Sequence, residues 1–208
     1  MPPAGGAAVF DHRKPCRDQE GSTRLSTIAR LRCFFLTHLS LPSSNRPVYQ
    51  TVRKRKSRAI LEIGVGNAQR ALGMIAVASC AWPPSSIRYT GIDLFEAGTD
   101  SGRPHLSLKE AHRLLRATGA VVRLVPGSPL DALRQTANNI GPADLIVVSQ
   151  WLASALNPEV WFYFPRMMHA DSLVLIQKSE ASGRIKTGRL SADQVRQLAG
   201  RASWQRAA

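Results

Sequence analysis

Short apolar runs alternate with amphipathic segments along the central part of the chain. The runs contain few polar positions, which is typical of strands that are covered on both faces of a sheet. Between them, apolar residues recur every three or four positions, a spacing that predicts helices. Strands and helices in alternation predict right-handed crossovers and an open, mainly parallel sheet. The five predicted strands are 59–63, 87–93, 121–125, 144–149 and 172–177.

Local signals mark where the helices between these strands begin. Ser107 and Glu110 have the spacing of a capping box, in which each side chain satisfies a backbone donor of the other residue. Ser128 followed by Pro129 is typical of an N-cap and the first helical position. The predicted helices are 68–79, a segment from 107 to Gly119, a segment from 128 and a helical piece from 157.

The N-terminal part of the chain has a different composition. Residues 1–22 are rich in Gly, Pro and charge, and we expect a disordered basic tail there. Within 23–58 we expect a helical extension followed by a basic linker. Leu25, Ile28, Leu31 and Phe35 recur at helical spacing and predict a helix from 26 to about 41. This helix could cover the sheet domain as a lid or mediate dimerisation.

The predicted sheet domain occupies 59–177, and the C-terminal segment 178–208 is basic and partly helical. Ser191 is a candidate N-cap for a final helix. The 31 residues after Gln177 show no pattern of a strand pair. The fold class is therefore α/β, a Rossmann-like doubly wound sheet with helices on both faces and an N-terminal helical extension.

Charge separates the same regions. The chain of 208 residues has 28 Lys and Arg against 14 Asp and Glu, a net charge of +14. Residues 1–60 hold 12 basic and 3 acidic residues, 61–177 hold 9 of each, and 178–208 hold 7 and 2. The whole excess therefore lies in the flanks, which makes nucleic acid a possible partner of the flanks alone. Aromatic residues are only 6%, which argues against stacking platforms for single strands.

The cysteines and the hydropathy of the chain indicate the cellular compartment in which we expect the protein. Cys16, Cys33 and Cys80 lie far apart, so they form neither a zinc pattern nor a disulfide framework. This usage is typical of a reducing compartment, and we expect a cytoplasmic protein. No apolar run approaches the length of a membrane span, and the N-terminus lacks the pattern of a secretory signal.

The turn after the first predicted strand carries the strongest chemical signal. Gly64 and Gly66 permit a tight turn and the close approach of a ligand to the backbone. The following helix offers free N–H groups and the positive end of its dipole. Glu62 is a carboxylate in an otherwise apolar strand, so it needs a cationic ligand, a hydrogen-bond partner or access to solvent.

The spacing of this turn discriminates between ligand classes. Dinucleotide enzymes have a third glycine in Gly-x-Gly-x-x-Gly, and here that position is Gln69. The acid followed by Gly-x-Gly instead resembles motif I of class I S-adenosylmethionine-dependent methyltransferases. Residues 89–95 (Tyr-Thr-Gly-Ile-Asp-Leu-Phe) are similar to the second motif of that family, and 122–128 and 143–148 to its third and fourth strands.

The resemblance implies a strand order of 3-2-1-4-5 and S-adenosyl-L-methionine as the cofactor. It implies that Asp93 holds the two ribose hydroxyls and that Leu94 contacts the adenine. Ser128 stands where the family often has an acid, and it could bind the adenine edge or serve only as an N-cap. The implied cofactor-binding residues are Glu62, Gly64, Val65, Gly66, Asn67, Asp93, Leu94, Gly127 and Ser128.

The departures from the family concern the acceptor side. The third glycine of motif I is Ala68, and the usual sixth and seventh strands are not evident. The fourth strand ends in Ser149-Gln150-Trp151, which could line an acceptor pocket, and it lacks the carboxylate that metal-assisted members place there, so we expect no metal. No catalytic residue is identified. His105 and His112 are candidate bases but are more typical of surface positions.

We therefore expect a class I methyltransferase that transfers a methyl group to an unidentified acceptor, a small molecule in our interpretation. In-line alignment supplies much of the acceleration in such a transfer. The alternative is a noncatalytic nucleic-acid-binding module on a degenerate Rossmann-like fold, motivated by the basic flanks. A dinucleotide or nucleotide-sugar enzyme is the third and weakest hypothesis.

Overall fold

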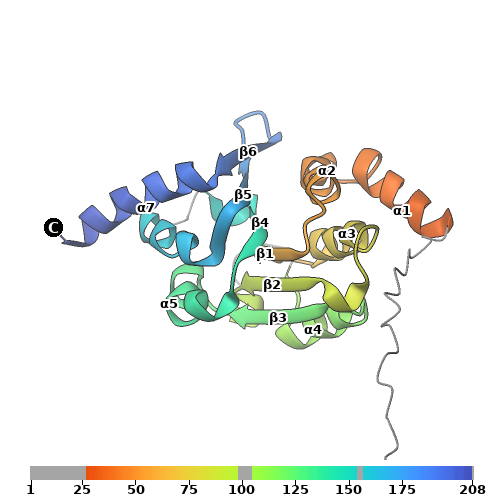
Figure 1. Cartoon of the computed structure of the whole chain (residues 1–208), viewed down its shortest axis with the longest axis horizontal. Coiled ribbons are helices and arrows are strands. Elements are labelled where there is room, and N and C mark those ends of the chain that lie inside the picture. The colour runs from red at the N-terminus through yellow and green to blue at the C-terminus, as the bar shows by residue number, and fades with distance from the viewer. Residues whose placement is uncertain (1–26, 98–104, 154–156, 208) are drawn as a thin grey trace, which may run out of the picture.

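A single six-stranded sheet organises the chain (Figure 1). The computed structural model describes residues 27–97, 105–153 and 157–207, with side chains to residue 202. The strand order is β3-β2-β1-β4-β5-β6, and all neighbours up to β5 are parallel, which confirms the predicted fold class and order. The strands are β1 Ala59–Ile63, β2 Arg88–Asp93, β3 Val121–Pro126, β4 Ala143–Val148, β5 Met168–Ser179 and β6 Ile185–Ser191.

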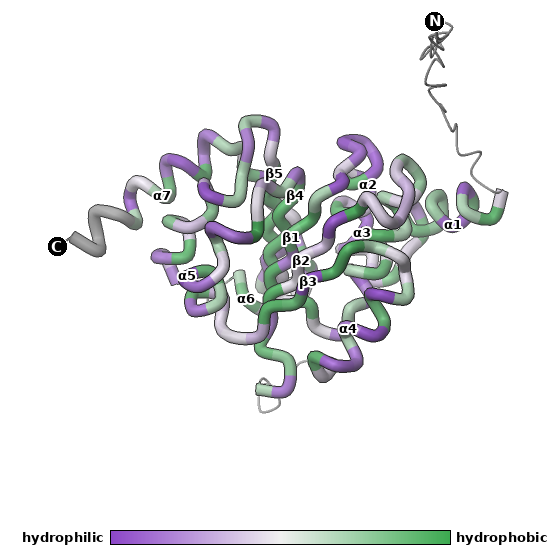
Figure 2. Tube along the Cα trace, turned by 60° about the horizontal axis from the view of Figure 1, so that its bottom comes forward, coloured by the Kyte–Doolittle hydropathy of each residue, from purple (hydrophilic) through white to green (hydrophobic). Residues whose placement is uncertain are grey.

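Helices cover both faces of this sheet. Helices α2, α3 and α4 lie on one side, and α5 and α7 on the other (Figure 1). Figure 2 shows the hydrophobic segments running through the central strands between these layers. The helices are α1 Thr27–His38, α2 Arg46–Arg55, α3 Gln69–Ala78, α4 Leu108–Arg116, α5 Pro129–Ile140, α6 Gln150–Ala153 and α7 Ala192–Ala207, with short 3-10 turns η1 Ser43–Asn45, η2 Pro84–Ser86, η4 Pro158–Phe162 and η5 Phe164–Met167.

Alternation along β1 divides the core into two clusters. Ile60 packs with the helices of one face, whereas Leu61 and Ile63 pack with those of the other. All five residues of β1 are buried, as its apolar run predicts. The edge strand β3 differs, because Val121 is 57% exposed and burial alternates along the strand. The expectation of burial on both faces was wrong for β3.

The N-terminal extension contains a helix that the sequence pattern did not indicate. Helix α2 includes most of the basic run, yet it buries Val48, Tyr49 and Val52 against the sheet domain. A Cβ at Gly73 of α3 would lie 2.4 Å from the Tyr49 hydroxyl, so glycine permits this close approach. The basic linker predicted at the end of 23–58 is therefore helical as far as Arg55, and only 56–58 connect α2 to β1.

Helix α1 forms close to its predicted position, and the residues whose spacing predicted it are exposed. Ile28 is 79% and Leu31 68% exposed, and Phe35 is 53% exposed, whereas Cys33 is buried. Helical spacing therefore identified the helix, and the apolar residues that define that spacing lie on its solvent side. Leu25 and the predicted tail at 1–22 lie outside the described residues.

The C-terminal segment contains a strand where none was predicted. Strand β6 pairs antiparallel with β5 along its whole length. The prediction failed because β6 has no apolar face. Side chains alternate between the two faces of a strand, so Ile185 and Leu190 lie on opposite faces, each together with a basic residue. Helix α7 follows directly, and Ser191 caps it as predicted, since its hydroxyl accepts a hydrogen bond from the Gln194 backbone N–H at 3.3 Å.

Candidate functional site

The carboxyl ends of β1 and β4 border a cavity of about 180 Å³. The structure places four of the predicted cofactor residues on its wall, Gly64, Val65, Gly66 and Asn67. The segment after β4, predicted to line an acceptor pocket, also lines this cavity. The other lining residues come from this segment, from α3, from the η1 region and from β5 and β6: Pro42, Ser44, Asn45, Gln69, Arg70, Ser149, Gln150, Trp151, Gln177 and Ile185.

The turn after β1 is shaped by its contact with β4. Gly64 has a φ of +93°, and a Cβ at this position would lie 2.6 Å from the Cβ of Ser149. A larger residue would therefore force the turn away from β4. Asn67 braces the turn just before α3, because its Oδ1 accepts the backbone N–H of Gln69, the first residue of that helix, at 3.2 Å.

Asp93, the last residue of β2, forms a hydrogen bond to the turn at 64–66 that follows β1, called the glycine turn below. Its Oδ2 accepts the Gly66 backbone N–H at 2.7 Å, and its Oδ1 accepts the Leu94 N–H at 2.7 Å. Its backbone carbonyl accepts the N–H of Gly127 at 2.9 Å. Parallel topology thus gathers the predicted residues of the first three strands at one edge. Asp93, Leu94 and Gly127 lie beside the cavity rather than on its wall.

Ser128 is the N-cap of α5, which was one of its two predicted roles. The backbone N–H of Asp131 donates to its Oγ at 3.3 Å, and the hydroxyl donates to the Asp131 carboxylate at 2.6 Å. The only hydroxyl proton is therefore used within the helix cap. This geometry favours the capping role over contact with an adenine edge.

Glu62 is fully buried and does not line the cavity. Its Oε1 accepts a hydrogen bond from Arg70 Nε at 2.6 Å, and its Oε2 accepts one from the Tyr89 hydroxyl. The possibility that Glu62 reaches solvent was wrong. Direct contact of Glu62 with a ligand is also disfavoured, because its carboxylate is fully buried and does not reach the cavity wall.

Arg70 connects the buried Glu62 to the cavity wall, because it binds Glu62 and itself lines the cavity. Its Nη2 donates to the Gly64 carbonyl at 2.9 Å, and its Nη1 donates to the side chain of Gln177 on β5. Gln177 in turn donates to the Ser44 carbonyl at 2.9 Å. Sequence reasoning missed Arg70 and Gln177. The available signal was the need of a buried carboxylate for a cation, which the chain itself supplies eight residues later.

Burial dominates the electrostatics of this network. Burial raises the pKa of Glu62, while the charge of Arg70 and the hydrogen bonds from Tyr89 and Arg70 oppose that rise. Burial and the neighbouring Glu62 carboxylate raise the pKa of Tyr89 well above its usual value. They also raise the pKa of Tyr49 to about 12. Both phenols therefore remain protonated at neutral pH.

The two histidines named as candidate bases, and a third histidine in β5, lie away from this cavity. His105 and His112 are exposed, and His169 lies at the opposite end of the sheet, 3.1 Å from Asp144. None of the three lines the cavity at β1 and β4. Within the described ranges, no three His, Cys, Asp or Glu side chains gather as a metal site. The aromatic segment at 161–164 packs against the core, as expected.

Comparisons with solved structures give the same fold. An O-methyltransferase from Bacillus cereus in complex with S-adenosylhomocysteine is 15% identical, with a TM-score of 0.51 over 88% of this chain and 80% of that one. A candidate O-methyltransferase from Klebsiella pneumoniae is 16% identical, with a TM-score of 0.51 over 87% and 80%. No protein-family model and no curated protein sequence matches the chain.

Proposed function

We propose that this chain, which has the fold of class I S-adenosylmethionine-dependent methyltransferases, binds S-adenosylmethionine and transfers its methyl group to an acceptor. The observation that carries the proposal is the juxtaposition of the glycine turn and Asp93 at the carboxyl edge of the sheet, where such sheets bind ligands. The neighbour from Bacillus cereus, which contains S-adenosylhomocysteine, supports the assignment of the ligand.

The residues present fit the adenosine half of this cofactor. Each oxygen of the Asp93 carboxylate accepts one backbone N–H, so each retains a lone pair for a ribose hydroxyl. Leu94 is half-buried next to it and supplies an apolar contact for the base. Gly127 borders open space at the end of β3, because no atom lies within 4 Å of a Cβ built there.

The cavity itself fits the amino-acid half of the cofactor. Its volume of about 180 Å³ is small for a whole nucleoside ligand, so we place the aminoacyl end there. Arg70 uses three of its five guanidinium N–H groups inside the protein, and the others can meet a carboxylate. We propose that Glu62 positions Arg70 and does not contact the ligand.

The sulfonium supplies an activated methyl group, and the protein must align an acceptor with it and exclude water. We assign that task to Ser149, Gln150 and Trp151, which line the same cavity as the glycine turn. The cavity wall carries no His, Asp or Glu within the described residues. An acceptor that must lose a proton would therefore bring its own acidity or use a group outside those ranges.

The remaining expectations are more general. We propose 59–177 as the cofactor-binding unit, together with α2, which packs on it. No described helix is long and apolar enough to cross a membrane. A cytoplasmic location stays a prediction from cysteine usage.

Calorimetric titration with S-adenosylhomocysteine tests the proposal. We expect saturable binding that Asp93→Asn weakens about 10- to 100-fold, because hydrogen bonds to a charged group contribute about 1.5–3 kcal/mol. Asp193→Asn on α7 makes the same change at an exposed carboxylate away from the cavity and should leave affinity unchanged. Absence of binding at millimolar ligand, or equal affinity of the Asp93 variant, would contradict the proposal.

A further inference from the structure

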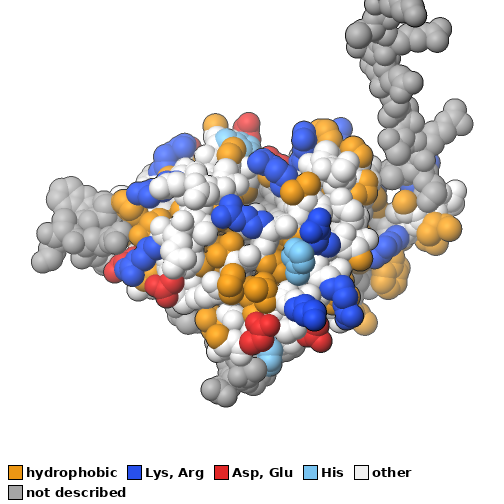
Figure 3. All heavy atoms as spheres, turned by 90° about the horizontal axis from the view of Figure 1, so that it is seen from below, with side chains coloured by type: hydrophobic (Ala, Val, Ile, Leu, Met, Phe, Trp, Pro, Cys, Tyr) orange, Lys and Arg blue, Asp and Glu red, His pale blue; other side chains and the backbone are white. Residues whose placement is uncertain are grey.

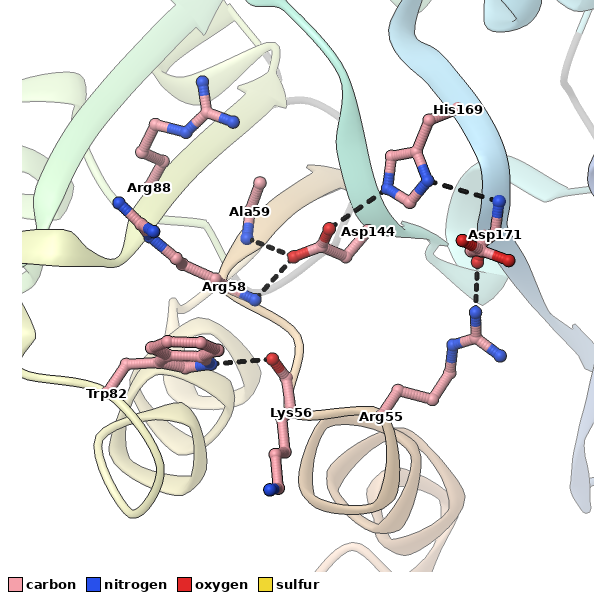
Figure 4. Close-up of a pocket in the computed structure, with 9 residues that line it drawn as sticks. All are labelled: Arg55, Lys56, Arg58, Ala59, Trp82, Arg88, Asp144, His169 and Asp171. Carbon is pink, nitrogen blue, oxygen red and sulfur yellow. Dashed lines mark hydrogen bonds and ion pairs between the residues drawn. The ribbon is translucent and has the colours of Figure 1, made fainter.

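A second and larger cavity lies at the amino ends of the strands, opposite the site described above. Its volume is about 450 Å³. Its walls come from the end of α2 and from the first residues of β1, β2, β4 and β5 (Figure 4). The lining residues are Arg55, Lys56, Arg58, Ala59, Trp82, Arg88, Asp144, His169 and Asp171.

The positive charge of this cavity is not neutralised within the protein. Arg55, Lys56, Arg58 and Arg88 line it, and none of the four forms an ion pair with any described residue. Each arginine is instead held by a backbone carbonyl. Arg58 Nε donates to the Ser86 carbonyl at 2.8 Å, Arg88 Nη2 to the Pro142 carbonyl at 3.2 Å, and Arg55 to the Asp171 carbonyl.

Two carboxylates, Asp144 and Asp171, also line the cavity, and neither forms an ion pair with Arg58 or Arg88. Asp144 accepts the backbone N–H groups of Arg58 at 2.6 Å and Ala59 at 2.8 Å, and it binds His169 at 3.1 Å. Asp171 lies with His169 on one side of the cavity, whereas Arg58 and Arg88 lie together on the other (Figure 4). That second side is a concentrated positive wall.

A role in stabilising helix α2 explains some of the basic residues between 53 and 58, but it does not explain Arg58 or Arg88. Arg53, Lys54 and Arg55 are in the last turn of α2, where positive charge favourably opposes the helix dipole. Arg58 precedes β1 and Arg88 begins β2, so neither has that role. The pairing of Ala59 with Arg88 brings them to the same edge of the sheet.

Arg58 is also held by an aromatic ring. Its guanidinium carbon lies 5.7 Å from the centre of the Trp82 ring, and Trp82 is fixed by a hydrogen bond from its Nε1 to the Lys56 carbonyl at 2.7 Å. A guanidinium has five N–H donors in a planar fork, and the hydrogen bonds above use one of them in each arginine. The remaining donors are oriented before any ligand arrives.

We propose that this cavity binds the phosphate group of a phosphorylated small molecule through Arg58 and Arg88. Two guanidinium forks match phosphate oxygens by charge-assisted hydrogen bonds. The cavity volume of about 450 Å³ is in the range of small-ligand pockets, which favours a small molecule over a continuous polymer backbone. On the face shown in Figure 3, Lys and Arg side chains are scattered among apolar and acidic ones rather than forming one broad patch.

The proposed phosphate site is independent of the proposed methyl transfer. Strand β1 runs from this cavity to the glycine turn, and its five residues span about 16 Å. A small ligand bound here cannot reach the turn, so we infer a separate recognition or regulatory site.

Calorimetry with pyrophosphate, ADP and adenosine tests this inference. We expect pyrophosphate and ADP to bind and adenosine not to bind. The double variant R58Q/R88Q should lose affinity about tenfold or more. The variant R113Q/R116Q on α4 removes the same charge from exposed positions and should bind as the wild type does. If ADP binds more tightly than pyrophosphate, the ligand class is a nucleotide. If the two affinities are equal, the phosphate groups alone account for binding.

A charge-conserving variant and a second ligand separate loss of the phosphate site from loss of the fold. The variant R58K/R88K retains the charge and loses the fork geometry, so it should show intermediate affinity. Titration of each variant with S-adenosylhomocysteine reports separately on the proposed methyltransferase site and on folding. The inference is overturned if no phosphorylated probe binds, if R113Q/R116Q weakens binding as strongly as R58Q/R88Q, or if an RNA oligonucleotide binds far more tightly than ADP.

Discussion

Replacement of Arg70 by Met should make the stability of this protein strongly dependent on pH. The change removes the cation that is 2.6 Å from the fully buried Glu62 carboxylate while keeping a side chain of similar length. Burial already raises the pKa of Glu62, and Arg70 is the largest influence that opposes the rise. Without Arg70, the folded protein should hold Glu62 neutral over a wider range of pH.

The magnitude follows from proton linkage. In the unfolded chain Glu62 loses its proton near pH 4.3, approximately the value of a free glutamate. At higher pH the folded variant binds one more proton than the unfolded chain, so its free energy of unfolding falls by about 1.4 kcal/mol per pH unit. This stability is present at low pH and is lost as pH rises toward the folded-state pKa. At a pH where Glu62 is charged, the lost pair costs about 3–5 kcal/mol.

Urea denaturation at several pH values between about 5 and about 8 measures this dependence. The hydrogen bonds that Arg70 makes to Gly64 and Gln177 are also lost, but their cost is independent of pH and does not enter the slope. The double variant R70M/E62Q should lose the slope and exceed R70M in stability at neutral pH. Arg134→Met removes a solvent-accessible pair and should leave stability and its dependence on pH nearly unchanged.

Two results would refute this reasoning. One is a dependence on pH in R70M equal to that of the wild type. The other is a double variant no more stable than R70M at neutral pH, because the cost would then come from packing and not from the buried charge.

Three further substitutions test local geometry. Gly64→Ala should cost about 2–4 kcal/mol, since it strains a positive φ and overlaps Ser149, and Ser149→Gly should restore part of the loss in urea denaturation; no restoration would argue against the overlap. Tyr89→Phe should cost about 1–3 kcal/mol by leaving one oxygen of Glu62 without its donor, which a neutral result in the same assay would exclude. Ser107→Ala removes the capping box of α4 and should cost about 1 kcal/mol, seen as a decrease in Tm of about 2–4 °C; an unchanged Tm would show that the cap is dispensable.

Local patterns sufficed for the features that depend on neighbours in the chain. The capping boxes at Ser107 and Ser191 were predictable because all their partners lie within three residues. The proximity of Gly66 and Asp93 was predictable as well, since the carboxyl ends of adjacent parallel strands meet at one edge of a sheet. The resemblance of these motifs to methyltransferases led to the same arrangement.

Burial was the least predictable property. Helix α1 has helical spacing, yet Ile28 and Leu31 face solvent, because spacing defines a face and does not say what the face contacts. The apolar face of α2 was hidden by its basic composition, and Val48 and Val52 are fully buried. Strand β6 carries too weak an alternation to stand apart from a loop until β5 is present to pair with it.

The sequence by itself determined the alternation of strands and helices, the glycine turn and the place of Asp93 beside it, because these follow from backbone sterics and from chain order. Only the tertiary structure decided the partners of the charged residues. Glu62 binds Arg70 across a turn, Arg70 binds Gln177 from a distant strand, and Arg58 meets Arg88 through the register of β1 and β2. Electrostatic interactions depend on distance and burial in space, and the order of residues along the chain fixes neither.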